Sequence, residues 1–401
     1  MKITFLIHNA YGIGGTNRTT LNLAAALADR HEVEIVSMFR HRVRPRFEVD
    51  PRVRLVPLVD LREGFPDAVD ARSGEPAVVF PAVEKRYRQY SRLTDLRAEE
   101  YLRRCAADVI IGTRPGINVY LARFGSRRAL RIAQEHLTHD AHGKRLRVTL
   151  ARHYAGLDAV VTTTEADAAV YRARMPLPGV RVLAVPNIVP DPAVPPSDGT
   201  ASVIAAAGRL VPGKRFDLLI EAFGQVAAKY PEWSLRVYGA GPERERLKEL
   251  IGERGLDERV ELMGVRSPIE AEFAQASIVA SASSAESFGM TLAEAMRCGV
   301  PVVSTNCPLG PAEIITPGVD GLLVPVGDGQ ALAKALLELV GDETARRRMG
   351  RAALVSARRF DPGPIIERYE NLFAELAESR DVRRRRRHAD WRRRLHGILR
   401  R

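Results

Sequence analysis

The stretch Glu286-Ser-Phe-Gly-Met-Thr-Leu-Ala-Glu294-Ala-Met-Arg-Cys-Gly299-Val-Pro301 decides how the second half of the chain is interpreted. Apolar residues before it, at 276–283, and after it, at 300–305, each predict a short buried strand. Ser287 to Gly289 interrupts any helix, so we expect Glu286 in a loop and Glu294 about one turn inside the helix that follows. The stretch therefore predicts a strand, a loop, a helix and a second strand.

The start of this expected helix is a candidate phosphate site. Free N–H groups near Gly289, Met290 and Thr291 would face the crevice at the strand ends, where they favour an anion. A diphosphate would fit there.

Two carboxylates seven residues apart are common on helices, so the neighbouring segments carry the argument. They follow one another in the order of a known family: Gly208-Arg209-Leu-Val-Pro-Gly-Lys214, Tyr238-Gly239-Ala-Gly241-Pro242-Glu243, Val260-Glu-Leu-Met-Gly264, Cys307-Pro-Leu-Gly-Pro311-Ala-Glu313-Ile-Ile and Gly318-Val-Asp-Gly321-Leu-Leu-Val-Pro325. With them the chain resembles the retaining glycosyltransferases of family 4 (glycosyl transferases group 1), which use nucleotide sugars, and within that family a polysaccharide and teichoic-acid subset.

The resemblance implies an α/β fold of the GT-B type, with two facing Rossmann-like domains, parallel sheets and an interdomain cleft. In the N-terminal half, alternating strand and helix patterns independently predict a parallel sheet covered by helices. The proline-rich segment 187–200 cannot continue a strand or helix. We expect an N-terminal acceptor-side domain at 1–186, a hinge linker at 187–200, a nucleotide-sugar-binding domain at 201–361, a helix crossing back to the N-terminal domain at 362–380 and a basic amphipathic tail at 381–401.

The first domain should carry the acceptor site in its loops. Residues 60–80 lack periodicity and contain Gly64, Pro66, Gly74 and Pro76, so we expect a mobile surface excursion. A long polar helix is expected at 83–104.

Composition limits the class of protein. The 401 residues suit two domains, and 45% hydrophobic with 27% charged residues is typical of a soluble globular protein. The chain contains no apolar run of about 18 residues and begins too polar for a signal peptide, so we expect a cytoplasmic location. Cys105, Cys298 and Cys307 lack metal-ligand spacing and should be free thiols.

The positive charge is concentrated at one end. Of the net charge of +12, residues 383–401 contribute +9 through ten arginines and Asp390, which leaves +3 for the other 382 residues. We therefore expect no nucleic-acid binding by the protein as a whole. Trp391, Leu395, Ile398 and Leu399 would share one helical face, so the tail predicts peripheral docking on an anionic membrane surface, with a solvated disordered tail as the alternative.

A nucleotide-sugar donor presents a diphosphate that needs cations. Arg209 and Lys214 follow an expected strand in a loop shaped by Pro212 and Gly213, where both can neutralise the diphosphate. The chain has no Asp-x-Asp, the usual carboxylate pair for a bridging divalent ion. We predict transfer without a metal, and no cofactor beyond the nucleotide-sugar cosubstrate.

The resemblance implies roles for individual residues of the second domain. Glu294 would accept the ribose hydroxyls, and Glu286 would contact hydroxyls of the donor sugar. The backbone of Phe288, Gly289 and Met290 would surround that sugar, although Phe288 is equally an ordinary core residue. The remaining donor contacts would be Gly239 and Gly241, which leave room for the nucleotide or simply make turns, with Pro242, Thr291 and the backbone near Met263, which would pair with the base.

In the first domain the turn Gly12-Ile-Gly14-Gly15-Thr16-Asn17 permits close approach of a phosphate and resembles the Gly-Gly loop of the family. It lacks the third glycine of a dinucleotide fingerprint, so a nicotinamide cofactor is not expected. His136 resembles the cleft histidine that contacts the donor sugar or steadies positive charge at the anomeric carbon. A structural role for His136 remains open, and His139 and Glu135 are the other candidates.

The resemblance thus implies a retaining hexosyltransferase that moves sugar from a nucleotide-diphosphate sugar, with UDP favoured, to an unknown hydroxyl acceptor in cell-envelope glycan or glycolipid synthesis. Three alternatives stay open. The first is a catalytically silent sugar-nucleotide-binding partner, although its expected mark, loss of Glu286, Arg209 or Lys214, is absent. The others are a transferase acting on a small-molecule metabolite and a sugar-nucleotide epimerase of similar architecture, although the retaining motif argues against the epimerase.

Overall fold

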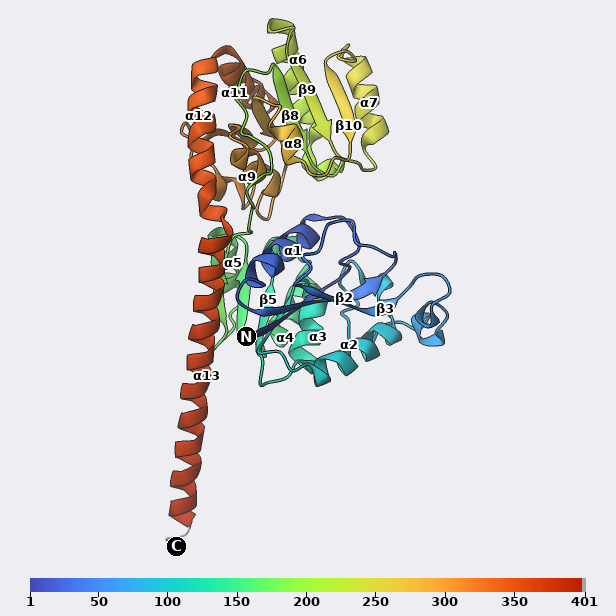
Figure 1. Cartoon of the computed structure of the whole chain (residues 1–401), viewed down its shortest axis with the longest axis vertical. Coiled ribbons are helices and arrows are strands. Elements are labelled where there is room, and N and C mark those ends of the chain that lie inside the picture. The colour runs from blue at the N-terminus through green and yellow to red at the C-terminus, as the bar shows by residue number, and fades with distance from the viewer. Residues whose placement is uncertain (399–401) are drawn as a thin grey trace. The chain divides into compact units, whose positions relative to one another are not determined.

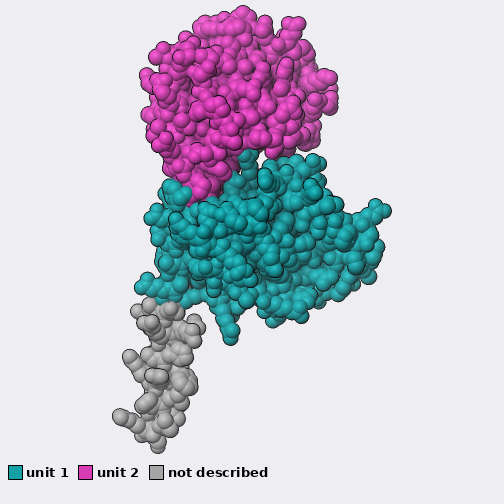
Figure 2. Space-filling view, viewed as in Figure 1, with its two compact units in different colours: residues 1–185, 363–401 teal, residues 186–362 magenta. Residues whose placement is uncertain are grey.

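The computed structural model describes residues 1–398, and side chains over residues 1–380. The chain forms two compact units (Figure 2): unit 1 comprises Met1–Val185 and Gly363–Arg401, and unit 2 comprises Pro186–Pro362. The expected linker at 187–200 lies in unit 2 and is hydrogen-bonded into it. The Val189 N–H donates to Phe360 O (3.0 Å), and the Ser197 N–H donates to Cys298 O (2.8 Å).

Unit 1 is built on one parallel sheet of seven strands in the order β3-β2-β1-β4-β5-β6-β7. Its strands are β1 (Lys2–Ile7), β2 (Glu32–Arg40), β3 (Arg54–Asp60), β4 (Val109–Gly112), β5 (Leu130–Gln134), β6 (Ala159–Thr162) and β7 (Arg181–Ala184). Its helices are α1 (Gly15–Leu27), α2 (Arg92–Arg104), α3 (Pro115–Phe124), α4 (Lys144–Tyr154), α5 (Glu165–Arg174) and most of α13 (Pro362–Ile398), as Figure 1 shows.

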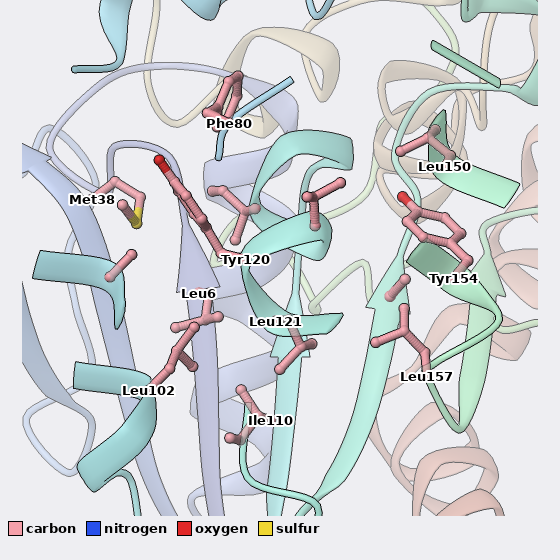
Figure 3. Close-up of a cluster of buried hydrophobic side chains, with 14 of the residues drawn as sticks. Leu6, Met38, Phe80, Leu102, Ile110, Tyr120, Leu121, Leu150, Tyr154 and Leu157 are labelled. Carbon is pink, nitrogen blue, oxygen red and sulfur yellow. The ribbon is translucent and has the colours of Figure 1, made fainter. Parts of the chain in front are cut away.

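Buried apolar side chains from strands and helices fill one side of this sheet. Figure 3 shows Leu6 of β1 and Ile110 of β4 in one cluster with Leu102 of α2, Tyr120 and Leu121 of α3, and Leu150 and Tyr154 of α4. Strands buried on both faces read as continuous apolar runs, which is why Ile3 to Ile7 and Val109 to Ile111 were recognisable in the sequence.

The helix expected at 83–104 begins later, at Arg92. Ser91 is the N-cap of this helix and forms a capping box. Ser91 Oγ accepts from the Thr94 N–H (3.5 Å), and Thr94 Oγ1 accepts from the Ser91 N–H (2.9 Å). The polar residues before Ser91 form turns, including a 3₁₀ turn at Tyr87–Gln89. The expected start was wrong because the local cap outweighs a polar pattern that continues upstream.

The excursion at 60–80 is anchored at its end. The buried Asp95 carboxylate of α2 accepts from the N–H groups of Val78 (2.6 Å), Val79 (2.9 Å) and Phe80 (3.3 Å). Tyr120 donates its hydroxyl to the same carboxylate (2.5 Å). These bonds fix the chain where it passes back over the sheet.

Unit 2 is built on a second parallel sheet, of six strands in the order β10-β9-β8-β11-β12-β13. Its strands are β8 (Val203–Ala207), β9 (Ser234–Tyr238), β10 (Val260–Gly264), β11 (Ile278–Ser281), β12 (Val302–Thr305) and β13 (Gly321–Val324). Its helices are α6 (Phe216–Lys229), α7 (Arg244–Glu253), α8 (Glu270–Phe273), α9 (Met290–Arg297), α10 (Pro311–Ile314), α11 (Gly329–Gly341) and α12 (Glu343–Ser356). Apolar clusters cover both faces of this sheet.

Helix α13 starts at the last residue of unit 2 and packs on unit 1. Tyr369 accepts from Gln134 Nε2 (2.7 Å), and Arg380 donates to Asp158 Oδ1 (3.0 Å) and Ala129 O (2.6 Å). No helix within residues 1–398 is both long and apolar enough to cross a membrane. The apolar face expected from Trp391, Leu395, Ile398 and Leu399 lies outside the side chains that the structure describes.

Candidate functional site

The order of strands in unit 2 reverses between β8 and β11, because β9 and β10 extend to one side and β12 and β13 to the other. Ligands of open α/β sheets bind outside the carboxyl ends of the strands at such a switch point. The loops that leave β8 and β11 meet there. Ser284 donates both its N–H (2.9 Å) and its hydroxyl (3.1 Å) to Gly213 O, which joins the two loops.

Lys214 and Glu286, expected to act on the same donor, form an ion pair at this point. Glu286 Oε1 also accepts from Ser283 Oγ (2.8 Å). Hydrogen bonds hold the backbone of Glu286, since its N–H donates to Pro308 O (2.9 Å) and its carbonyl accepts from the Leu309 N–H (2.8 Å). The Glu286 side chain is only 14% exposed, so solvent screens this pair less than a surface pair.

Arg209 adds a solvent-exposed positive charge to the loop that carries Lys214. It lies two residues beyond β8 and is exposed, and within the described part of the chain no side chain forms an ion pair with it. Arg209 thus offers a guanidinium that is not already neutralised, in the same β8–α6 loop that carries Lys214.

Helix α9 begins beside this loop, as the sequence predicts. Gly289 is its N-cap with φ of 111°, a conformation that favours glycine. Glu294 lies one turn inside the helix and is buried. Met290 and Thr291, the first two helical residues, are half-buried at the end whose N–H groups have no partners within the helix.

Phe288 has a structural role through its side chain. The ring is buried and packs edge-on against Phe360, with ring centroids 5.3 Å apart. The core interpretation of this side chain is therefore the one that the structure supports. Only the backbone of Phe288 remains a candidate contact for a sugar.

Gly239 and Gly241 are required for a reason that the sequence does not reveal. A Cβ at Gly239 would lie 1.8 Å from Gly208 O, and one at Gly241 would lie 2.2 Å from Leu210 O. The space that we expected a nucleotide to use is occupied by the backbone of the chain itself. The glycines let the loops after β8 and β9 pack against each other.

The other two expected donor residues lie on neighbouring segments. Pro242 follows Gly241 and is exposed. Met263 is half-buried near the end of β10, and Gly264 beside it accepts from the Gly239 N–H (2.8 Å). The loops after β8, β9 and β10 are thus connected along one edge of the sheet.

In unit 1, His136 is the second residue beyond β5 and is half-buried. Its Nε2 is buried without a hydrogen-bond partner within the described part of the chain. Burial lowers the pKa of His136 to about 4, and the nearby Glu135 carboxylate opposes this only in part. At neutral pH His136 is therefore an uncharged imidazole.

Glu135 and His139, the other two candidates in this segment, are both buried and have structural partners. Glu135 Oε1 accepts from the Tyr154 hydroxyl and from Asn118 Nδ2 (3.1 Å). His139 donates its backbone N–H to Asp167 Oδ1 (2.9 Å), and its ring packs edge-on against Tyr171. These contacts favour His136 as the functional histidine of the segment.

The glycine-rich turn of unit 1 leads into α1. Gly14 and Gly15 are exposed, and a Cβ at either would meet no atom within 4 Å, so the space above this turn is open. Thr16 is half-buried on the first turn of the helix. Asn17 donates from Nδ2 to Asn9 O (2.7 Å) and Gly12 O (2.9 Å), which fixes the turn.

Two contributors to the unit 2 site were missed. Ser283 binds Glu286 and Ser284 binds the Gly213 loop, whereas the sequence pattern predicts only a strand at 276–283. Polar residues directly after an apolar strand were the signal that could have identified them. Within the side chains of residues 1–380, no group of three or more His, Cys, Asp or Glu is placed to hold a metal ion.

Comparisons with known proteins agree with this architecture. The sequence profile of glycosyltransferase family 4 matches residues 13–191, and that of the glycosyl transferases group 1 matches residues 190–355. An exopolysaccharide phosphotransferase from Streptomyces coelicolor is 36% identical over 397 residues, which are 96% of this chain and 42% of the relative. The chain thus spans less than half of that relative.

An uncharacterized glycosyltransferase from Haemophilus influenzae is 25% identical over 92% of this chain and 99% of its own length. Among solved structures, S. aureus TarM in complex with Fondaparinux, alpha-GlcNAc-glycerol and UDP has a TM-score of 0.77 at 16% identity, covering 93% of this chain and 99% of that chain. The two family profiles together span residues 13–355, and the two parallel sheets match the GT-B fold of these neighbours. The chain belongs to the group 1 glycosyltransferases of the GT-B fold.

Proposed function

We propose that this chain transfers a hexosyl group from a nucleotide-diphosphate sugar to a hydroxyl acceptor, with retention of configuration, in the synthesis of a cell-envelope glycan or glycolipid. The observation that carries the proposal is the Lys214–Glu286 pair beside Arg209 at the switch point of unit 2. A site with fixed cations and a shielded carboxylate suits a ligand that combines a diphosphate with sugar hydroxyls.

Each group has a distinct task. Arg209 and Lys214 neutralise the diphosphate, and the N–H groups at the start of α9 add to the positive potential. Glu286, oriented by Ser283, accepts from hydroxyls of the donor sugar. Glu294 accepts from the ribose hydroxyls. With two side-chain cations in this position, the transfer needs no divalent metal.

The reaction proceeds on one face of the sugar. The bond between the anomeric carbon and the leaving phosphate oxygen breaks, and a bond from that carbon to the acceptor oxygen forms on the same face. The leaving phosphate oxygen takes the proton of the acceptor hydroxyl. His136, with its pKa of about 4, is uncharged at neutral pH, so its contribution is a polar contact and not proton donation from an imidazolium.

UDP is the favoured nucleotide because the fold neighbour TarM was crystallised with UDP. A thermal-shift screen of UDP-, GDP- and ADP-sugars identifies the donor, since a ligand that binds only the folded chain raises its melting temperature. Slow release of the nucleotide from that sugar in the presence of EDTA supports metal-independent transfer. Release that requires a divalent metal contradicts that part of the proposal.

The alternative is a catalytically silent sugar-nucleotide-binding partner. Tight nucleotide binding with no release of sugar, in the presence or absence of metal, would favour it. A transferase for a small-molecule metabolite would instead show turnover with a monomeric acceptor and none with glycan fragments. Retention is tested by the anomeric configuration of the product, read by NMR.

We also propose a cytoplasmic enzyme that docks on the inner face of the membrane through the arginine-rich tail, and no nucleic-acid partner. The support is the sequence of residues 383–401, which has ten arginines and one acid. Flotation with anionic liposomes compares the full chain with one that ends at Asp381. Equal flotation of both proteins would reject the tail as the membrane contact.

A further inference from the structure

Two basic segments in unit 1 are not used by the chemistry above. Residues 40–46 contain Arg40, Arg42, Arg44 and Arg46 without an acid, and residues 85–88 contain Lys85, Arg86 and Arg88 without an acid. We call the two segments together the basic rim. The first leaves the carboxyl end of β2, and the second precedes α2.

Hydrogen bonds bring both segments to the same place. Asn9 Nδ2 and His41 Nδ1 lie 2.8 Å apart, which attaches the first segment to the end of β1. His8, the residue before Asn9, bonds to the hydroxyl of Tyr90 through Nδ1 (2.8 Å) and to Arg86 through Nε2 (3.2 Å). The two segments therefore border consecutive residues just beyond β1.

This location is the switch point of unit 1. The order of strands reverses between β1 and β4, so a crevice is expected outside the carboxyl ends of these two strands. Arg114, two residues after β4, pairs with Glu84, the residue directly before the second segment, and so ties that segment to the end of β4. Burial, and to a lesser extent the charges of Arg86 and Arg114, lower the pKa of His8 to about 3, so His8 adds no positive charge here at neutral pH.

The nearby acids Asp60 and Glu84 form their short ion pairs with arginines outside the basic rim. Asp60 pairs with Arg62 (2.7 Å) and lies 3.9 Å from Arg40, and Glu84 pairs with Arg114 (2.5 Å). Four exposed cations of the rim have no ion-pair partner within the described side chains: Arg44, Arg46, Lys85 and Arg88. A cluster of unpaired like charges repels itself, and a bound anion relieves that repulsion.

We propose that the basic rim binds anionic groups of the acceptor, so that the acceptor is a polymer with phosphodiester or carboxylate groups along its chain. The inference rests on the proposed function and on the expectation from the sequence that the N-terminal domain is the acceptor side. Cations that lie on two segments suit anions spaced along a polymer better than one compact anion. Of the aromatic residues in or beside the rim, Phe39, Phe80 and Tyr90 are buried, whereas Phe47 and Tyr87 are half-buried, so an RNA probe is needed to test for base stacking.

The test uses the full chain and four fluorescent probes of similar length: poly(glycerol phosphate), polygalacturonate, neutral dextran and a single-stranded RNA. Arg44→Ala/Arg46→Ala is compared with Arg127→Ala/Arg128→Ala, which removes the same charge from exposed positions just before β5, at the opposite edge of the sheet. We expect the rim variant to bind one of the two polyanions about tenfold more weakly than the control variant does. Which polyanion responds distinguishes phosphodiester from carboxylate.

A site-resolved measurement separates the rim from the arginine-rich tail, which is the same in both variants. Phenylglyoxal modifies accessible arginines, and mass spectrometry locates them. We expect the polyanion to protect Arg44 and Arg46, dextran to protect neither, and Arg127 and Arg128 to remain reactive. Equal protection by dextran, equal weakening of both variants or tightest binding of RNA at the rim would each overturn the inference.

Donor hydrolysis measured in parallel distinguishes the two proposals. Neither double variant should change it, because these arginines lie outside the donor site in unit 2. Loss of rim-dependent binding with intact hydrolysis would reject the anionic acceptor alone. Rim-dependent binding without hydrolysis of any nucleotide sugar would reject the transferase and leave a polyanion-binding protein.

Discussion

Replacement of Glu286 by glutamine should change nucleotide binding and sugar transfer in opposite directions. Glu286 pairs with Lys214 and partly neutralises it, so a diphosphate that approaches Lys214 also meets the carboxylate. The Glu286→Gln side chain keeps its shape and still accepts from Ser283 Oγ, but the negative charge is gone. The diphosphate then has a cation without a competing anion.

The expected magnitudes follow from the exposure of the pair. Glu286 is 14% and Lys214 is 25% exposed, so removal of the repulsion should be worth about 1 kcal/mol, or about fivefold tighter binding of the nucleoside diphosphate. Loss of a charged contact to the reacting sugar should lower kcat/KM of transfer about 100-fold. Stability should change by about 1 kcal/mol or less.

Isothermal titration with the nucleoside diphosphate and initial rates with the intact donor measure the two effects. Lys214→Met should weaken both binding and transfer. Lys248→Met and Glu249→Gln, at exposed positions of α7, control for net charge and should change neither. If Glu286→Gln bound the nucleotide more weakly, the carboxylate would not lie beside the diphosphate, and the assignment of this site would be refuted.

Three further predictions concern stability and protonation. Gly239→Ala should destabilise unit 2 by about 1–3 kcal/mol in urea unfolding, because its Cβ would overlap Gly208 O, whereas Gly143→Ala, with no atom within 4 Å, should be nearly neutral. Asp95→Ala should cost about 3 kcal/mol and speed amide exchange at residues 78–80, which lose their acceptor; unchanged exchange would contradict the anchor. The His136 imidazole should titrate near pH 4 by NMR. The pKa of His136 in the folded chain lies below the ordinary value of 6.5, so the unfolded chain binds the proton at higher pH. The free energy of unfolding should therefore fall as the pH drops from about 6.5 to about 4. His136→Gln should flatten this pH dependence.

The sequence predicted those parts of the fold that depend on local patterns. The strand at Val203–Ala207 and the helix at Phe216–Lys229 are of this kind, because an apolar run marks the strand and an amphipathic period marks the helix. The start of α2 was misplaced because a pattern of polar residues does not reveal a cap. The four-residue strand β13 was seen only as a motif, since so short a run has no periodicity.

Sequence motifs predicted which residues are candidates for the site, but they did not predict which of these residues contact one another. Lys214 and Glu286 are 72 positions apart, and only the strand order shows that their loops adjoin. The partners of Glu135 come from α3 and α4, so its burial could not be read from the residues beside it. Sequence motifs identify the candidate groups, whereas the three-dimensional contacts decide which of them remain available to a ligand.

Unit 1 is made of two stretches separated by the whole of unit 2, because Tyr369 and Arg380 of α13 supply contacts to β5 and to the residues around β6. During synthesis on the ribosome, unit 2 has its complete sequence available before unit 1 does. We therefore expect unit 2 to fold first, whereas unit 1 cannot be completed until residues 363–380 have emerged. A nonsense codon shortly before residue 363 would leave the earlier-made half unfinished, although all seven of its strands had been translated.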